Sequence, residues 1–289
     1  METLNNIVLT IQNYMSNYVL IIALLGAGLW FSFRLGFIQV RGFGEGMRRT
    51  FGGLFSKKGE AGADGMSSFQ ALATAIAAQV GTGNIAGAAT ALAIGGPGAI
   101  FWMWIAAFLG MATIYAEAIM AQKYKTVGVD GQVTGGPVYY IRAAFKGTFG
   151  KVLAGIFAIL ITLALGFMGN AVQSNSIAAS FHTAFGIPQW IMGLVVAVIA
   201  IFVFMGGMKR IAKVTETIVP FMAALYIIGS LIVIIYNYKN IPYAFASIFI
   251  GAFSPSSVVG GAAGATVKLA LTKGVARGLF SNEAGMGST

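Results

Sequence analysis

Residues 69–93 read FQALATAIAAQVGTGNIAGAATALA, an apolar run long enough to cross a bilayer. Its middle holds Gly81-Thr82-Gly83-Asn84, where two glycines and two polar side chains weaken the helical hydrogen bonds at membrane depth. Lipid cannot satisfy the freed N–H and C=O groups, so such a break persists only where protein or a polar cavity covers it. Because secondary transporters hold small solutes and ions at broken helices, this stretch predicts a transport site.

Composition supports a multi-pass, all-α membrane protein. Of the 289 residues 57% are hydrophobic and 9% are charged, and the mean hydropathy is +0.82; soluble domains carry about 25% charged residues. The net charge of +10 lies in short loops between apolar runs, which indicates membrane orientation rather than nucleic-acid binding. Without cysteine, and with one histidine, the sequence predicts no transition-metal site; it also lacks catalytic motifs, so we expect no cofactor and no enzyme.

The apolar runs predict a single membrane domain over residues 1–289. The predicted spans are 18–33, 69–93, 99–121, 152–182, 189–204 and 211–236. A second polar, glycine-rich break is expected over about 262–289, and the sequence leaves open whether 243–259 crosses or re-enters the membrane. Residues 34–66 and 122–150 are the predicted cytoplasmic loops.

Loop charges predict the orientation. The loops after the first, third and fifth spans are rich in Lys and Arg, whereas those after the second and fourth have neither. The positive-inside rule therefore places the basic loops in the cytoplasm and the N-terminus outside. Within the second basic loop we expect an amphipathic interfacial helix over Val138–Phe149, with an irregular loop as the alternative. Glu117 and Glu216 are expected to be interfacial carboxylates.

The chemistry of the first break favours a zwitterion and a cation. Where a helix restarts, its first N–H groups lack helical partners and carry the positive end of the dipole, so Gly81, Thr82, Gly83 and Asn84 could bind a carboxylate. Carbonyls at Ala77 to Val80, which end the first half-helix, and the Asn84 side chain would suit a hard cation. The alternative is close helix packing through small residues such as Gly83 and Gly87.

Other polar residues lie inside the predicted spans. Asn170 and Gln173 share one helical face. Buried amides are costly in lipid, so these two should face substrate or ion, with hydrogen bonding between helices as the alternative. Glu283 lies in the second polar break, where an ionic and a structural role are both open.

Four segments together resemble the alanine/glycine:cation symporter family, the sodium:alanine symporters. They are QVGTGNIAG at 79–87, GGPGAIFWMW at 95–104, GFMGNAVQSN at 166–175 and GLFSNEAGMGS at 278–288. The likeness runs from about Leu29 to Thr289. It implies a partial five-plus-five inverted-repeat (LeuT-like) transporter fold with one extra N-terminal helix.

The resemblance also implies a function, sodium-coupled symport of alanine or glycine across the plasma (inner) membrane. Carbonyls of Phe280, Ser281 and Asn282 would face the substrate ammonium, and Glu283 would join the sodium site. Phe167 would pack on the substrate side chain or simply in the core. Because family members are considerably longer, we expect an N-terminal fragment truncated in the second repeat. A non-transporting remnant and a passive channel are the alternatives.

Overall fold

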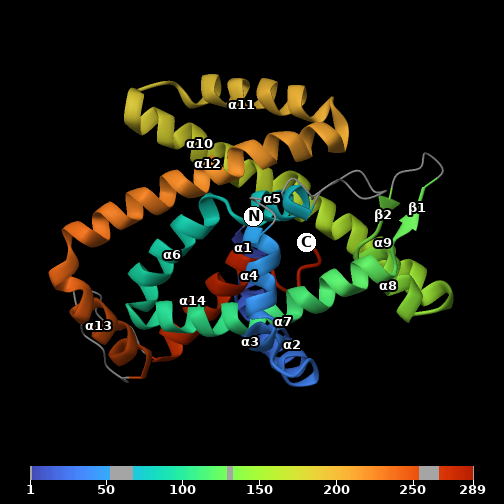
Figure 1. The fold of residues 1–289 in the computed structure, drawn as a ribbon, viewed down its shortest axis with the longest axis horizontal. Coiled ribbons are helices and arrows are strands. Elements are labelled where there is room, and N and C mark those ends of the chain that lie inside the picture. The colour runs from blue at the N-terminus through green and yellow to red at the C-terminus, as the bar shows by residue number, and fades with distance from the viewer. Residues whose placement is uncertain (1, 53–67, 129–132, 254–266, 289) are drawn as a thin grey trace. The chain divides into compact units, whose positions relative to one another are not determined.

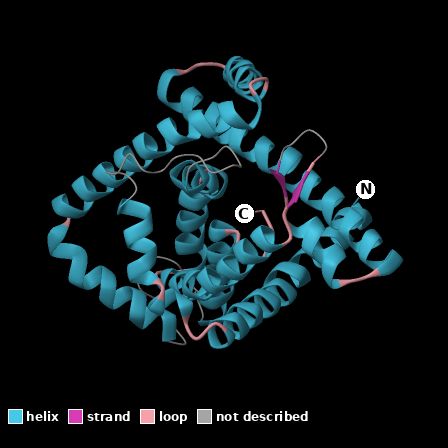
Figure 2. Cartoon of the chain, turned by 45° about the vertical axis from the view of Figure 1, so that its right-hand side comes forward, coloured by secondary structure: helices cyan, strands magenta, loops and turns pink. Residues whose placement is uncertain are grey.

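The computed structural model describes residues 2–52, 68–128, 133–253 and 267–288. Helices make up nearly all of this part of the chain (Figure 1). The sheet within it is an antiparallel hairpin of β1 (Thr126–Val127) and β2 (Val133–Thr134), drawn in magenta in Figure 2. An all-helical fold class is therefore confirmed apart from this small hairpin. The predicted regions 34–66, 122–150 and 262–289 lie in part outside the described residues.

The first half of the described chain contains two long helices, two short ones and one interrupted one. The first long helix consists of α1 (Glu2–Tyr14), a π-helical segment η1 (Met15–Val19) and α2 (Leu20–Arg34). The short helices are α3 (Ile38–Arg41) and α4 (Phe43–Gly52). The interrupted helix consists of α5 (Ser68–Gln79) and α6 (Thr82–Gly95), and a tight turn leads from it to α7 (Gly98–Lys123).

The second half begins after the hairpin. A continuous helical stretch of 39 residues contains α9 (Gly147–Ile161), the π-helical segment η2 (Thr162–Gly169) and α10 (Asn170–Phe185). The other elements are α8 (Pro137–Ala144), α11 (Gln189–Phe204), α12 (Gly207–Tyr236), η3 (Tyr238–Asn240), α13 (Ile241–Phe253) and α14 (Val267–Asn282).

Three helices among the described residues are long and apolar enough to cross a membrane. They are Gly98–Lys123, Gly147–Phe185 and Gly207–Tyr236. The apolar helices Leu20–Arg34 and Gln189–Phe204 are shorter. In the most apolar 18-residue stretch of Gly147–Phe185, only 6% is buried within the protein. The buried share is also 6% in the corresponding stretch of Gly207–Tyr236. Apolar surface on this scale is stable against lipid rather than water, so the chain is a membrane protein.

The chain divides into two compact units. Unit 1 is drawn from Met1–Phe43, Gly83–Ala116 and Ile227–Met286. Unit 2 is drawn from Gly44–Thr82, Glu117–Tyr226 and Gly287–Thr289. The division falls within the interrupted helix, between Thr82 and Gly83, so the two halves of the predicted binding segment belong to different units.

Small residues build the core of unit 1 because they let α14 pack closely on α7. A Cβ on Gly274 would overlap the carbonyl oxygen of Ala99, and one on Gly278 would lie 3.0 Å from the Cβ of Ala106. Between these glycines, Val275 is completely buried, and Leu279 is buried one turn further along. Close approach through small residues is the usual way in which helices associate in membranes.

Unit 2 contains two helical hairpins, α8 with α9 and α10 with α11 (Figure 1). The predicted amphipathic helix Val138–Phe149 is wrong at its C-terminal end. The helix stops at Ala144, Phe145 is extended, and Gly147 has φ +81°. A left-handed glycine ends one helix direction and allows another to start, so Phe149 belongs to α9.

Candidate solute-binding site

The helix is interrupted at Val80 and Gly81, so the interruption overlaps the predicted Gly81–Asn84 break at Gly81 alone, and Thr82, Gly83 and Asn84 are helical. The amide of Val80 still bonds to the carbonyl of Ile76 (2.8 Å), and regular helix resumes at Thr82. Two residues are therefore enough to separate α5 from α6. The restart places the N–H groups of Thr82, Gly83 and Asn84 in the first turn of a 14-residue helix.

Gln173 of α10 caps this restarting helix within unit 2. Its Oε1 accepts a hydrogen bond from the Thr82 amide (3.1 Å) and another from the Thr82 hydroxyl (2.8 Å). A Cβ on Gly81 would overlap the Gln173 amide, so a larger residue there would push this flexible side chain aside. The structure thus brings together three of the predicted substrate-binding residues.

Asn84 and Ser281 form a second junction, within unit 1. The Asn84 Nδ2 donates to the Ser281 carbonyl oxygen (2.9 Å) and to its Oγ (2.7 Å). This links the first turn of α6 to the last turn of α14. Elsewhere on α6, Gly87 is buried and a Cβ there would lie 3.5 Å from Arg277, so α6 also packs on α14 through a small residue.

The second polar break begins later than predicted. Residues 280–282, expected to be unwound, lie in the last turn of α14, and the chain leaves the helix at Glu283, which has φ +53°. Asn282 Oδ1 accepts a bond from the Ala284 amide (3.0 Å) and so caps the turn that follows. Polar residues such as Ser281 and Asn282 can occupy the last turn of a helix, so their polarity alone did not show where the helix ends.

The remaining predicted residues do not converge on these junctions. Phe167 lies in η2 with 67% of its surface exposed. The exposed side chain of Asn170 bonds to the carbonyl of Gly166 in its own helical stretch (2.9 Å). Val80 is exposed and Ala77 is half-buried on α5. Whether any of them contacts solute or ion stays a prediction.

A polar contact between α5 and α12 in unit 2 was not predicted. Gln70 donates from Nε2 to Glu216 Oε2 (2.9 Å), and one turn along the hydroxyls of Thr74 and Thr215 lie 3.2 Å apart. The i, i+4 spacing of Gln70 and Thr74 in an apolar run was the available signal. Their partners on α12 could not be predicted from local spacing.

Glu117 is buried (7% exposed) near the end of α7, and its place at the membrane interface stays a prediction. Burial, with the nearby Glu117 carboxylate as a smaller cause, raises the pKa of Tyr140 on α8 to about 12. On α4, hydrogen bonds from Arg49 and Arg48 (2.6 Å each) lower the pKa of the exposed Glu45 carboxyl.

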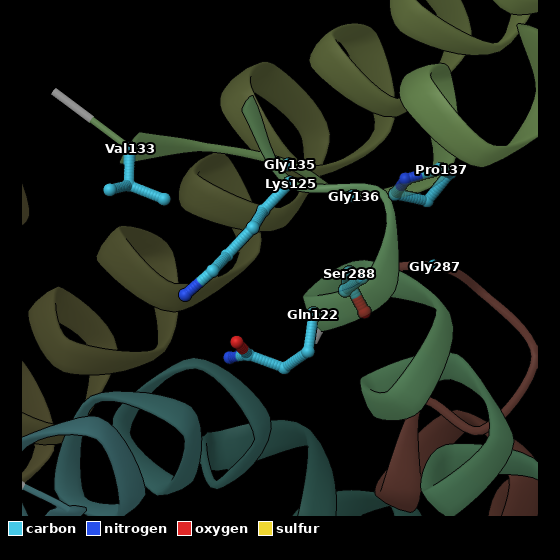
Figure 3. Close-up of a pocket in the computed structure, with 9 residues that line it drawn as sticks. Gln122, Lys125, Val133, Gly135, Gly136, Pro137, Gly287 and Ser288 are labelled. Atoms are coloured by element: carbon cyan, nitrogen blue, oxygen red, sulfur yellow. The ribbon is translucent and has the colours of Figure 1, made fainter. Parts of the chain in front are cut away.

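A pocket of about 370 Å³ lies in unit 2 (Figure 3). Gln122 and Lys125 contribute to its wall, together with Gly136 and Pro137 at the start of α8 and Ser288 near the end of the described chain. None of the predicted substrate- or cation-binding residues lines it, so we assign it no role in solute binding.

Long apolar helices define this chain as a membrane protein, and one of its helices is interrupted beside polar junctions. Residues 1–289 match the sodium:alanine symporter family, and the chain belongs to that family. The family resemblance seen in the sequence is thereby confirmed.

Relatives carry related names. The chain is 43% identical over 285 residues to the "Sodium/alanine symporter AgcS" of Methanococcus maripaludis, covering 98% of this chain and 61% of the relative. It is 43% identical over 287 residues to the "Probable sodium/glutamine symporter GlnT" of Bacillus subtilis, covering 99% and 58%. A third, the "Putative sodium/proton-dependent alanine carrier protein YrbD" of the same organism, is 46% identical over 265 residues, covering 92% and 52%. The chain thus spans between 52% and 61% of the length of these three.

Proposed function

We propose that this chain acts in sodium-coupled symport of small neutral amino acids, alanine or glycine, and that the carboxylate binds at the start of α6. The interrupted helix carries this proposal. The amide and hydroxyl of Thr82 already hold one oxygen, that of Gln173, at a helix N-terminus. A carboxylate oxygen has the same needs and carries a charge that the helix dipole stabilises.

The substrate ammonium is assigned to the end of α14. The last carbonyls of a helix lack helical partners and carry the negative end of its dipole, so they attract a cation. The Ser281 carbonyl already accepts a bond from Asn84, which keeps the two helix ends together. Phe280, Ser281 and Asn282 thus provide main-chain oxygen, while Phe167 and Asn170 are proposed to face the substrate from the η2–α10 stretch.

For the coupling ion we propose oxygen ligands beside the break. Carbonyls of Ala77 and Val80, the side-chain oxygen of Asn84 and the carboxylate of Glu283 are all hard donors, which suit sodium rather than a transition metal. The names of AgcS, GlnT and YrbD all include sodium, and that of YrbD also includes protons. Sodium is therefore the first coupling ion to test, and protons the second.

The proposed setting is a LeuT-like five-plus-five fold with one additional N-terminal helix, in the plasma membrane with the N-terminus outside. In such folds the substrate and ion sites lie where two helices are interrupted or end in polar residues. The interrupted helix α5–α6 and the end of α14 are the two such places in this chain's described residues. Alternation of basic and neutral loops supports the orientation.

Counterflow in liposomes tests the function. Protein reconstituted with unlabelled alanine inside should accumulate labelled alanine from outside when sodium is present and much less when choline replaces it. A second series at different pH values without sodium tests proton coupling. Equal accumulation with and without sodium would refute sodium coupling, and no accumulation in either would refute transport by this chain.

A further inference from the structure

The Gln173 side chain holds the position that the proposed function gives to the substrate carboxylate. One oxygen, Oε1, accepts bonds from both the amide (3.1 Å) and the hydroxyl (2.8 Å) of Thr82. The side chain is half-buried, and its amide lies so close to Gly81 that no Cβ fits between them. Two bonds to one oxygen at a helix start form an N-terminal cap, here supplied by another helix.

The capping oxygen is neutral, whereas the proposed ligand is charged. Hydrogen bonds to an ionised acceptor are roughly twice as strong as those between neutral groups. A carboxylate would also gain from the helix dipole, to which an amide responds weakly. A carboxylate would therefore make stronger hydrogen bonds to the Thr82 donors than the Gln173 amide does.

We propose that Gln173 is an internal competitor, a side-chain cap that a substrate carboxylate must displace from Thr82 in order to bind. This rests on the proposed function and specifies how its carboxylate subsite opens. Displacement would move a side chain on α10, which directly follows the π-helical segment η2. Solutes without a carboxylate cannot displace Gln173 from Thr82, so Gln173 also makes the site specific for solutes that carry a carboxylate.

Truncating the Gln173 side chain should have opposite effects on alanine binding, depending on whether Gln173 competes with the substrate or contacts it. If Gln173 competes, the binding-competent state is only a fraction of the population, and removing the competitor raises apparent affinity by the inverse of that fraction. Gln173→Ala should then bind alanine roughly three- to tenfold more tightly, the range expected for loss of one or two ordinary hydrogen bonds. If Gln173 instead contacts substrate, Gln173→Ala binds alanine more weakly.

Alanine binding in saturating sodium, measured for the purified full chain, tests the proposal. Gln173→Glu supplies a permanent carboxylate to Thr82 and should weaken alanine binding by more than about tenfold. Asn175→Ala, which removes an exposed amide from the same helix, should bind like the wild type. Tighter binding by Gln173→Ala with weaker binding by Gln173→Glu supports competition; equal or weaker binding by Gln173→Ala overturns it.

Hydrogen exchange separates failure of this inference from failure of the function. Without alanine, the amides of residues 81–85 should exchange several-fold faster in Gln173→Ala than in the wild type, because the Thr82 amide loses its acceptor. An unchanged exchange rate would show that Gln173 does not cap Thr82. Competition by Gln173 would then be refuted even if sodium-dependent alanine binding persists. If no variant binds alanine, the proposed function fails and competition fails with it; alanine binding by Gln173→Ala alone would support competition.

Discussion

Asn84 joins two helices through a side chain 197 positions away in the sequence. Its Nδ2 donates to both the carbonyl and the hydroxyl of Ser281, at 2.9 and 2.7 Å. Hydrogen bonds between helices in a membrane contribute on average about 0.6 kcal/mol and at most about 1.7 kcal/mol. The junction therefore positions the end of α14 beside the start of α6 more than it supplies bulk stability.

A double-mutant cycle measures this junction. Asn84→Ala and Ser281→Ala should each lower the free energy of unfolding in detergent, and their combination should reveal a coupling of about 0.5–1.5 kcal/mol. Thr90→Ala is the matched control, because the Thr90 hydroxyl bonds to Ala86 within α6. Strict additivity of the two substitutions would contradict the contact.

At the scale of elements, α14 depends on its glycines to reach α7. Gly274→Ala should destabilise the protein by about 1–3 kcal/mol, because the new methyl overlaps a main-chain oxygen that cannot move alone. Gly26→Ala on α2 is the control, since a Cβ there has no neighbour within 4 Å. Thermal unfolding in detergent compares the two; equal melting temperatures would show that α7 and α14 do not pack this closely.

The polar contact between α5 and α12 predicts how substitutions of Glu216 change the stability of the protein. Glu216→Ala leaves the Gln70 amide without this acceptor, and should cost about 1–2 kcal/mol of stability. Glu216→Gln keeps a side-chain oxygen and should cost less, because the Gln70 bond can re-form. Chemical denaturation followed by tryptophan fluorescence distinguishes them; identical losses would mean that the charge, not the bond, is what matters.

The local sequence predicted where helices begin and end better than it predicted which residues form hydrogen bonds between helices. The Gly-Thr-Gly-Asn sequence predicted the interruption because glycine and polar residues weaken a helix locally, and α11 has the predicted bounds 189–204. The π-helical segment η1 has no glycine or proline, and the two glycines of η2, Gly166 and Gly169, do not distinguish it from glycine-containing α-helices such as α6. Gln173 was recognised as a polar residue, but its bond to Thr82 joins residues 91 positions apart. A contact of that kind is set by packing, which local periodicity does not record.

For the whole molecule, the charges of the loops predict the orientation in the membrane. The chain has no cysteine, so single cysteines report their own accessibility. In intact cells a membrane-impermeant maleimide should label Asn6→Cys, near the N-terminus, and should label Lys146→Cys in a basic loop only after permeabilisation. Both positions are exposed in the structure. The reverse labelling pattern would invert the proposed topology.

A high-resolution structure with sodium and alanine bound is the sharpest test of the proposed carboxylate site. We expect the alanine carboxylate within about 3 Å of the Thr82 amide, with the Gln173 side chain turned away from it. We also expect the ammonium beside the last carbonyls of α14. Alanine bound elsewhere, with Gln173 still on Thr82, would contradict the proposed site.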